Sequence, residues 1–263
     1  MTLLSGSVLL TGASGGIGQA IARALAPRGG DLVLSGRRRE VLEPLAAELG
    51  ARVVACDLSL REEVERLVEA AGQVDVLIAN AGVSASGDLV ELAQDEIDRM
   101  LEVNLRAPMA LARALAPAMV RRGRGHMVFV SSLQGKAATP LSSVYCASKF
   151  ALRGFALALR EDLRGRGVGV SVVLPGFIRE AGMFAESAAQ LPPGVGTRSP
   201  EDVARAVIAA VEHDRAEIDV APLGLRLGSS VASIAPALGA AVSRRLGSER
   251  IAARIVSGQQ DNG

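Results

Sequence analysis

The chain contains one tyrosine, Tyr145, and it lies four residues before Lys149. On a helix this spacing brings both side chains to one face, so the lysine ammonium can stabilise the tyrosine phenolate. Hydride transfer to a ketone creates an alkoxide, and a phenol can protonate it when its pKa of about 10 is lowered toward working pH. We therefore predict that Tyr145 transfers a proton. The competing interpretation is an ordinary surface pair.

Ser132 is a second candidate for the same chemistry, because it follows the apolar run His126 to Val130. At the end of a strand its hydroxyl could donate to a developing oxyanion. A serine in this position also serves commonly as a turn or cap residue. We predict that Ser132 acts together with Tyr145.

A glycine-rich segment reads Thr11-Gly12-Ala13-Ser14-Gly15-Gly16-Ile17-Gly18, directly after an apolar run and before a helical pattern. Glycines permit a tight turn and let a phosphate approach the backbone, where the N–H groups of the following helix hold the anion. An ordinary strand-to-helix connection would look similar, but the place after the first strand favours a dinucleotide. We predict cofactor contacts at Gly12, Ser14, Gly15, Gly16, Ile17 and Gly18.

The second apolar run ends at Gly36 and is followed by Arg37, Arg38 and Arg39. An acidic residue at this point favours NAD, whereas an arginine accommodates the 2′-phosphate of NADP. We therefore expect NADP(H) to be preferred, through Arg37 and Arg38, with NAD(H) still possible. We interpret Arg39 as the solvated start of the next helix.

Apolar runs of strand length alternate with segments of helical period, which is typical of a doubly wound α/β fold. The sequence predicts a seven-stranded, mostly parallel sheet with helices on both faces, in a single domain. The expected strands are Ser7 to Leu10, Asp31 to Leu34, Arg52 to Ala55, Asp75 to Ala79, His126 to Val130, Val168 to Leu174 and Glu217 to Val220. The expected helices are Gly16 to Pro27, Arg38 to Leu49, Arg61 to Ala71, Leu89 to Arg122 with a break near Pro108, Val144 to Arg164 and Pro200 to Glu212.

We expect residues 1–222 to form the catalytic domain, with a substrate loop at about 176–199 that is rich in Gly and Pro. Its apolar residues Met183, Phe184 and Leu191 suggest a fairly hydrophobic substrate. Residues 223–263 form an apolar helical tail of uncertain role, too interrupted for a membrane span. A tail helix that packs on the core or on a neighbouring subunit is favoured over an interfacial membrane helix.

The charge balance argues against two partner classes, because the net charge is +1 and only 22% of residues are charged. No overall field favours nucleic acid or an anionic membrane. Two cysteines, Cys56 and Cys146, cannot form a disulfide framework, and we expect a cytoplasmic protein. Neither His126 nor His213 has metal-ligand spacing, so no metal is expected.

Several ordered motifs together resemble the short-chain dehydrogenase/reductase family over roughly residues 5 to 222. They are the T-G-x-x-x-G-x-G turn at Thr11, Cys56-Asp57-Leu58, Asn80-Ala81-Gly82, Glu102-Val103-Asn104-Leu105, Ser131-Ser132, Tyr145-Cys146-Ala147-Ser148-Lys149 and Pro175-Gly176. The resemblance implies the catalytic residues Asn104, Ser132, Tyr145 and Lys149, with Asn104 holding the water or backbone that links Lys149 to solvent. It also implies a homodimer or homotetramer that pairs the long helices, and cofactor contacts at Asp57, Leu58, Asn80, Ala81, Gly82, Tyr145, Lys149, Pro175, Gly176 and Ile178.

The sequence departs from this family in two places. Ala79 replaces the first Asn of the usual N-N-A-G, and Phe177-Ile178-Arg179-Glu180 stands where a Thr commonly helps to hold the nicotinamide amide. An ionised Glu180 cannot donate in the same way. Backbone groups at Phe177 and Ile178, or the downstream loop, are the expected replacements.

The predicted function is an NADP(H)-dependent oxidoreductase that interconverts a carbonyl and a secondary alcohol of a small molecule. A 3-oxoacyl thioester reductase, acting on acyl-carrier or coenzyme A substrates, is the alternative within the same class. A non-catalytic nucleotide-binding regulator is a less favoured alternative, because a binding module has no need of a proton donor. A membrane-associated enzyme that uses the apolar tail is a further, disfavoured possibility.

Overall fold

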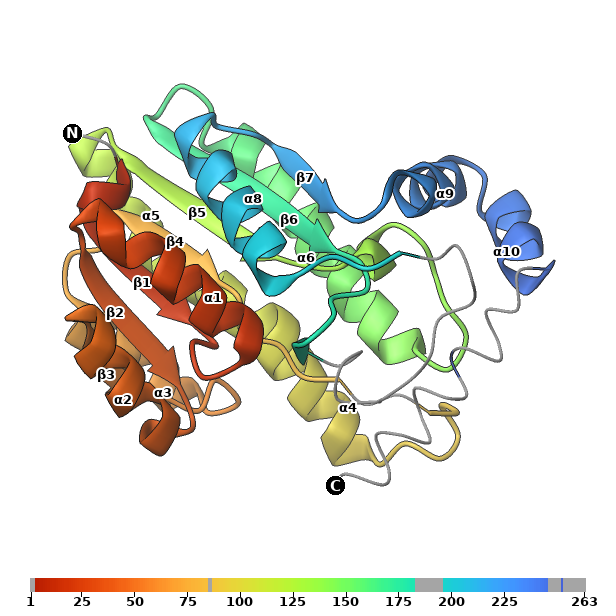
Figure 1. The fold of residues 1–263 in the computed structure, drawn as a ribbon, viewed down its shortest axis with the longest axis horizontal. Coiled ribbons are helices and arrows are strands. Elements are labelled where there is room, and N and C mark those ends of the chain that lie inside the picture. The colour runs from red at the N-terminus through yellow and green to blue at the C-terminus, as the bar shows by residue number, and fades with distance from the viewer. Residues whose placement is uncertain (1–2, 85–86, 183–195, 246–251, 253–263) are drawn as a thin grey trace.

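The computed structural model describes residues 3–84, 87–182, 196–245 and 252 of the chain. In these residues seven strands form one sheet in the order β3-β2-β1-β4-β5-β6-β7 (Figure 1). Every neighbouring pair is parallel, so the expected mostly parallel sheet is fully parallel. The strands are β1 (Ser7–Thr11), β2 (Asp31–Gly36), β3 (Arg52–Ala55), β4 (Val76–Ala79), β5 (Gly125–Val130), β6 (Val168–Pro175) and β7 (Glu217–Val220).

The strand order reverses between β1 and β4, because β1 leads to β2 on one side while β4 pairs with it on the other. Connections on the two sides of such a switch point diverge and leave a crevice at the carboxyl ends of the strands. The glycine-rich segment after β1 and the asparagine after β4 both lie at this crevice. The fold alone therefore predicts where a nucleotide would bind.

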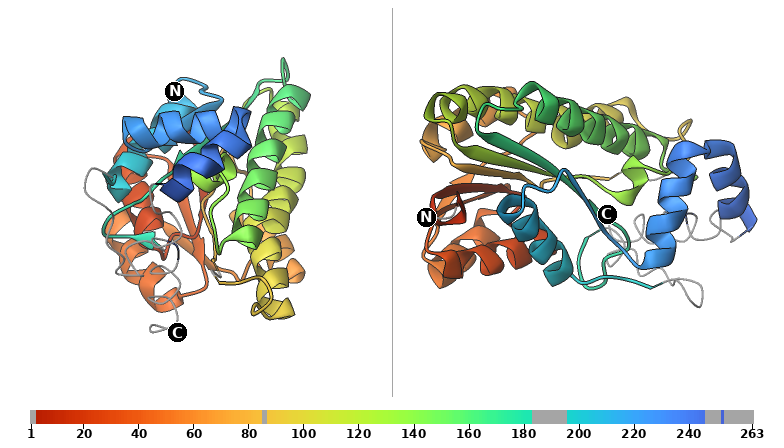
Figure 2. Two further views of the ribbon diagram at one scale, coloured as in Figure 1. Left: turned by 90° about the vertical axis from the view of Figure 1, so that its right-hand side faces the viewer. Right: turned by 90° about the horizontal axis from the view of Figure 1, so that it is seen from above.

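Helices cover both faces of the sheet, as Figure 2 shows with α5 and α6 on one side and α1 and α8 on the other. The principal helices are α1 (Gly16–Leu25), α2 (Arg39–Leu49), α3 (Arg61–Ala71), α4 (Gln94–Leu101), α5 (Ala107–Arg122), α6 (Ser143–Asp162) and α8 (Pro200–Glu212). They follow the predicted segments to within a few residues, except in the α4–α5 region.

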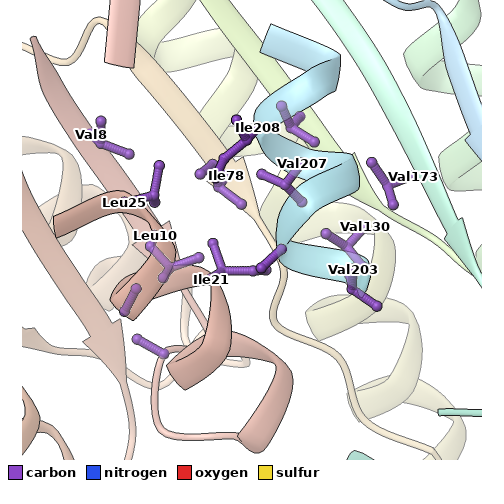
Figure 3. Close-up of a cluster of buried hydrophobic side chains, with 14 of the residues drawn as sticks. Val8, Leu10, Ile21, Leu25, Ile78, Val130, Val173, Val203, Val207 and Ile208 are labelled. Atoms are coloured by element: carbon purple, nitrogen blue, oxygen red, sulfur yellow. The ribbon is translucent and has the colours of Figure 1, made fainter. Parts of the chain in front are cut away.

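Two hydrophobic clusters fill the two sides of the sheet, since successive strand residues point to opposite faces. In β1, for example, Leu10 packs under α1 and α8, whereas Leu9 belongs to the cluster under α3, α5 and α6. Figure 3 shows the first cluster, where Ile21 of α1 and Val207 of α8 meet over the strands. Both sides of the sheet are thus buried, and this explains why the strands are continuously apolar.

The α4–α5 region differs from its prediction. The helix begins at Gln94 rather than at Leu89, and it runs to Arg122 through a π-helical turn, Glu102–Arg106, instead of breaking at Pro108. Proline has no N–H, so Pro108 cannot donate to the carbonyl of Asn104 four residues earlier, and the wider turn absorbs this loss. The π-turn contains Asn104, one of the predicted catalytic residues.

The tail forms two short helices rather than one, α9 (Leu223–Ile234) and α10 (Pro236–Arg245), separated where Pro236 follows Ala235. They lie beyond the carboxyl end of β7 (Figure 1). Leu225 packs against the core, whereas Leu223, Leu227 and Ile234 are exposed. Among the described residues, none of the helices has the length and apolar character needed to cross a membrane.

Candidate active site

A cleft of about 780 Å³ lies at the carboxyl ends of the strands on both sides of the β1–β4 switch point. Its lining includes thirteen of the predicted cofactor residues: Gly12, Ser14, Gly15, Gly16, Ile17, Gly18, Arg37, Arg38, Asp57, Leu58, Asn80, Ala81 and Gly82. Gly36, at the end of β2, lines it as well. The lining also includes residues that sequence reasoning missed, Val83, Leu92, Glu96 and Gly182 among them. These come from the loop after β4, from α4 and from the segment after β6, which no local motif connects to the cleft.

The glycine-rich segment leaves its backbone accessible to the cleft. Gly15 caps α1 without a side chain, so the N–H groups of the first helical turn have no intrahelical partner. A Cβ at Gly15 would meet only one atom within 4 Å, the Gly12 carbonyl oxygen at 3.6 Å. A helix N-terminus exposed in this way is suited to bind an anion such as a pyrophosphate.

Other glycines of the segment are required by close packing. A Cβ on Gly18 would lie 2.1 Å from the Gly12 oxygen, and a Cβ on Gly16 would lie 2.6 Å from the Ala181 Cβ. Gly12 has φ +67°, a conformation that favours glycine. The shape of the turn therefore depends on three positions at which any side chain would displace neighbouring backbone or the segment after β6.

The end of β4 is bound to the same turn. The amide of Asn80 donates to the carbonyl oxygens of Thr11 (3.1 Å) and Gly12 (3.2 Å). In return the Thr11 hydroxyl accepts the backbone N–H groups of Asn80 and Ala81, both at 3.2 Å. Four hydrogen bonds thus hold the two sides of the switch point together. They give Thr11 a structural role, and they give Asn80 one besides lining the cleft.

The end of β2 brings Gly36 and two arginines to the cleft. A Cβ on Gly36 would come within 3.0 Å of the Ser14 hydroxyl, so a side chain here would crowd the turn. Arg38 donates to the Ser14 carbonyl oxygen at 2.8 Å, while Arg37 also lines the cleft. The positive charge predicted for this end of the cleft is present.

The predicted proton donor lies on α6 behind this cleft. Tyr145 and Lys149 are both buried, and the Lys149 Nζ lies 5.6 Å from the centroid of the Tyr145 ring. Lys149 Nζ also donates to the Val130 carbonyl oxygen at 3.2 Å, at the end of β5. The helical spacing therefore places the pair on the inner face of α6, and the surface-pair interpretation is wrong.

Ser132 follows β5 and meets this pair. Its side chain is hydrogen-bonded to Tyr145, and its Oγ accepts the backbone N–H of Gln134 at 3.1 Å. It is also the N-cap of the 3-10 turn η4 (Leu133–Gly135). Capping uses the oxygen as acceptor, while the hydroxyl donates a long hydrogen bond of 3.5 Å to the Pro175 carbonyl oxygen. The cap role is therefore compatible with a role beside Tyr145, provided that the hydroxyl turns from Pro175.

Asn104 is fully buried, and its side chain is engaged by neighbours. Its Oδ1 accepts the Val83 N–H at 2.8 Å, while its Nδ2 donates to the Val83 oxygen at 2.8 Å and to the Ser148 Oγ at 3.2 Å. The amide thus fixes the loop after β4 to α6. Asn104 is expected to hold the water or the backbone that links Lys149 to solvent. In the structure its side chain holds backbone, namely the N–H and carbonyl groups of Val83.

Burial dominates the pKa values of the central pair. It raises the pKa of the Tyr145 phenol, against the opposing effect of the Ser132 hydrogen bond, and lowers the pKa of Lys149 to about 8. The expected lowering of the Tyr145 pKa is therefore absent in the protein alone, because desolvation disfavours the phenolate. In this state Tyr145 is a neutral acid at neutral pH.

Some predicted contacts lie apart from the cleft. Pro175, Gly176 and Ile178 do not belong to its lining, and the Ile178 side chain is buried in the hydrophobic core. Glu180 has φ +69°. Met183, Phe184 and Leu191 of the expected substrate loop lie outside the described residues.

Comparison with known proteins agrees with this geometry. The family model for the short chain dehydrogenase matches residues 7–192. The chain belongs to the short-chain dehydrogenase/reductase family. It is an oxidoreductase of the kind that uses NAD(P) and binds small carbonyl or alcohol substrates.

Two curated members of the family are similar over most of their length. The ketoacyl reductase HetN of Nostoc sp. is 37% identical over 230 residues, which cover 84% of this chain and 80% of that protein. Dehydrogenase/reductase SDR family member 7B of Bos taurus is 34% identical over 259 residues, covering 88% and 78%.

Solved structures of family members share the fold. A short chain dehydrogenase/reductase family protein superposes with a TM-score of 0.77 at 31% identity, covering 84% of this chain and 98% of the other. A candidate NAD(P)-dependent gluconate 5-dehydrogenase from Beutenbergia cavernae, solved with NADP at low occupancy, gives a TM-score of 0.73 at 30% identity, covering 84% and 96%.

The cleft of this short-chain dehydrogenase/reductase fits a dinucleotide. Its volume, the side-chain-free Gly15 and the unpaired first turn of α1 suit a pyrophosphate, and Asp57 lies at the end where the adenosine would bind. Among the described residues, no group of three or more His, Cys, Asp or Glu could hold a metal ion. The residues that line the cleft therefore adjoin the predicted proton-transfer residues, which follow β5 and lie on α6.

Proposed function

We propose that this protein is an NADPH-dependent reductase that converts a carbonyl to a secondary alcohol, and reversibly oxidises the alcohol. The observation that carries the proposal is the group formed by the buried Tyr145 and Lys149 with the partly buried Ser132. A bound reduced nicotinamide supplies the hydride. The three side chains supply what hydride transfer then requires, a proton and stabilisation of negative charge on oxygen.

The direction of reduction follows from the protonation states. The raised pKa keeps the Tyr145 phenol neutral, so it can donate its proton to the oxygen of the substrate as the alkoxide forms. The Ser132 oxygen accepts the Gln134 N–H, and its hydroxyl can donate to the same substrate oxygen by turning from the Pro175 carbonyl oxygen, to which it donates at 3.5 Å. The Lys149 ammonium stabilises the tyrosinate that remains. Its donation to the Val130 carbonyl holds it in place.

The preference for NADPH rests on the end of β2. The residues at this end are Gly36, Arg37 and Arg38, so there is no carboxylate to accept a hydrogen bond from a ribose 2′-hydroxyl. Both arginines line the cleft. A guanidinium pairs well with a phosphate dianion. Because Arg38 is partly engaged by the Ser14 carbonyl, we assign the larger share of 2′-phosphate binding to Arg37.

One assay tests both parts of this proposal. A panel of ketones, aldehydes and secondary alcohols is offered with NADPH or NADH, or their oxidised forms, and the absorbance of the reduced nicotinamide is followed. We expect turnover with NADPH, and we expect Arg37→Ala to raise the KM for NADPH about tenfold while leaving that for NADH unchanged. Equal KM values for both cofactors in the unmodified protein would refute the preference. Cofactor binding without turnover on any substrate would favour a nucleotide-binding regulator.

A 3-oxoacyl thioester reductase is the second candidate, and the likeness to the ketoacyl reductase HetN of Nostoc sp. favours it. The same buried group would protonate the 3-oxo oxygen, so the chemistry at Tyr145 does not separate the two. Activity on acyl-carrier or coenzyme A thioesters, with none on small ketones, would identify this function.

We further propose that the protein acts as a homodimer or homotetramer through the long helices. Apolar side chains on them are partly exposed in the single chain, namely Leu101 (36%), Met109 (39%) and Phe150 (40%). Light scattering on the purified protein would test this, and a Met109→Asp variant should dissociate the assembly if this surface is buried in it.

A further inference from the structure

A charged network lies beside the catalytic group on the edge strand β7. The two carboxylate oxygens of Glu217 bind different cations: Oε1 lies 2.5 Å from the Lys136 Nζ, and Oε2 lies 2.5 Å from the Arg153 Nε. Asp219, two residues along the same face of β7, binds the Lys136 Nζ at 2.7 Å. Glu217 therefore bridges two cations that come from separate parts of the chain.

The network is largely shielded from water. Lys136 is 7% exposed, and the side chains of Asp219 and Glu217 are 10% and 22% exposed. Burial alone would raise the pKa of Glu217, but hydrogen bonds from Arg153 and Lys136 outweigh it and lower that pKa. Both lysines of the chain are thus buried, one beside Tyr145 and the other on Glu217.

Each cation is attached to one of the catalytic elements. Lys136 is the C-cap of η4, and Ser132 is the N-cap of that same three-residue turn. Arg153 lies on α6 one turn after Lys149 and two turns after Tyr145, which places all three on one side of the helix. The bridge through Glu217 consequently joins the element that holds Ser132 to the element that holds Tyr145.

The turn η4 and the helix α6 also contact each other directly, and there is no room between them for one more carbon atom. A Cβ on Gly135 of η4 would lie 2.8 Å from the Lys149 carbonyl oxygen and 2.9 Å from the Ser131 Oγ. That Ser131 Oγ donates to the Lys149 oxygen at 2.9 Å. η4 and α6 are therefore in close contact beside Lys149, and the salt bridges through Glu217 connect them a second time.

We propose that Glu217 is a positioning residue, which sets the distance between the Ser132 hydroxyl and the Tyr145 phenol by holding Lys136 and Arg153 on one carboxylate. The inference builds on the proposed reductase function. It adds that the edge strand β7, which contributes no side chain to the reaction, determines the geometry of the proton donor.

The test uses the chain's single tyrosine as a reporter. Protein grown with 13Cζ-labelled tyrosine gives one NMR signal, from Tyr145, and that signal responds to hydrogen bonding at the phenol oxygen. A Ser132→Ala variant defines the signal when the Ser132 contact is lost. We expect Glu217→Gln to move the signal toward that of Ser132→Ala, because a neutral amide cannot accept from both cations.

Turnover supplies the second readout. We expect Glu217→Gln to lower kcat at least tenfold with the NADPH dissociation constant unchanged, since small displacements of reacting groups cost about this much or more. Asp31→Asn is the control, because Asp31 of β2 forms a salt bridge with Arg52 of the edge strand β3, at the opposite end of the sheet. It should leave both the NMR signal and kcat unchanged.

Two results would overturn the inference. One is a Glu217→Gln protein with a lower melting temperature but an unmoved Tyr145 signal, which would make the network purely stabilising. The other is an unchanged kcat in an enzyme whose unmodified form turns over. If Glu217→Gln does not fold, Arg153→Met serves instead, since its side chain is 25% exposed and it breaks only the α6 arm. The NMR signal is measured whether or not the reductase function holds, so the two failures are distinguishable.

Discussion

The two halves of the sheet edge recognise their ligands by different means. At the ends of β1, β2 and β4 the cleft is shaped by glycines, and it offers backbone N–H groups and the dipole of α1. In the other half the site consists of Ser132, which follows β5, and of the buried Tyr145 and Lys149 of α6. The pKa values of Tyr145 and Lys149 respond to their surroundings. The first half depends on the absence of side chains and the second on their identity.

This difference predicts opposite sensitivities. In the glycine-rich segment Thr11 to Gly18, called the cradle from here on, a single added methyl group should disrupt cofactor binding. The chemical character of the surrounding side chains matters less there. In the catalytic half the removal of one polar atom should abolish turnover while the fold and cofactor binding survive. Substitutions in the two halves can therefore be compared directly, and four of them test the contrast.

The largest effect is expected from Tyr145→Phe, which removes one oxygen atom. Without the phenol proton, reduction should slow by about 10²- to 10⁴-fold, the usual contribution of a general acid. The ring stays in place, so we expect the NADPH dissociation constant to change less than twofold. Steady-state kinetics and a fluorescence titration of bound NADPH measure both quantities. Full activity of this variant would contradict the mechanism.

Gly18→Ala should have the next largest effect, in the other half. Its Cβ would lie 2.1 Å from the Gly12 carbonyl oxygen, and a backbone contact of this kind cannot be relieved by a side-chain rotation. We expect a loss of about 1–3 kcal/mol in the free energy of unfolding, as for other overpacked sites, and at least tenfold weaker NADPH binding. Urea unfolding and NADPH titration measure these changes.

Gly15→Ala is the matched variant for that test. Its Cβ would have only an ordinary contact of 3.6 Å, so the fold should keep its stability while the methyl group narrows the cleft. Weaker NADPH binding with an unchanged free energy of unfolding would distinguish the glycines that packing requires from those that NADPH binding requires. Equal destabilisation by Gly15→Ala and Gly18→Ala would contradict it.

The cradle was the more predictable half because its signal is local. Gly12 to Gly18 follow a strand and open a helix, so seven consecutive residues indicate both the local structure and the ligand. The strands and most helices followed from the alternation of apolar runs, since burial on both faces leaves a strong pattern. In the catalytic half, Tyr145 and Lys149 were predictable from their spacing taken together with the other ordered motifs.

The remainder depended on contacts that sequence does not encode locally. Lys136 and Glu217 are 81 residues apart and meet only because η4 folds over β7. The direction of the Tyr145 pKa shift required knowledge of how deeply the ring is buried. The π-turn around Asn104 likewise depends on how α4 and α5 join, and the break predicted from Pro108 was wrong.

The third prediction concerns pH and Lys149. Burial lowers its pKa from 10.5 to about 8, so the ammonium is present below pH 8 and is lost as the pH rises through that value. The raised pKa of Tyr145 keeps the phenol protonated over this range, so the loss falls on the lysine alone. We expect kcat/KM for reduction to fall about tenfold per pH unit above pH 8. A profile that stays flat to pH 10 would show that the ammonium is not required.

The smallest effect tests whether every glycine near the site matters. Gly154 lies on α6 one residue after Arg153, and a Cβ there would meet nothing within 4 Å. Because alanine loses less backbone freedom than glycine in a helix, Gly154→Ala should raise the free energy of unfolding by about 0.5–1 kcal/mol without changing kcat or NADPH binding. The same substitution that disrupts the cradle at Gly18 would then stabilise the catalytic helix. A loss of activity at Gly154 would mean instead that α6 must flex during turnover, and the catalytic half would depend on backbone freedom as the cradle does.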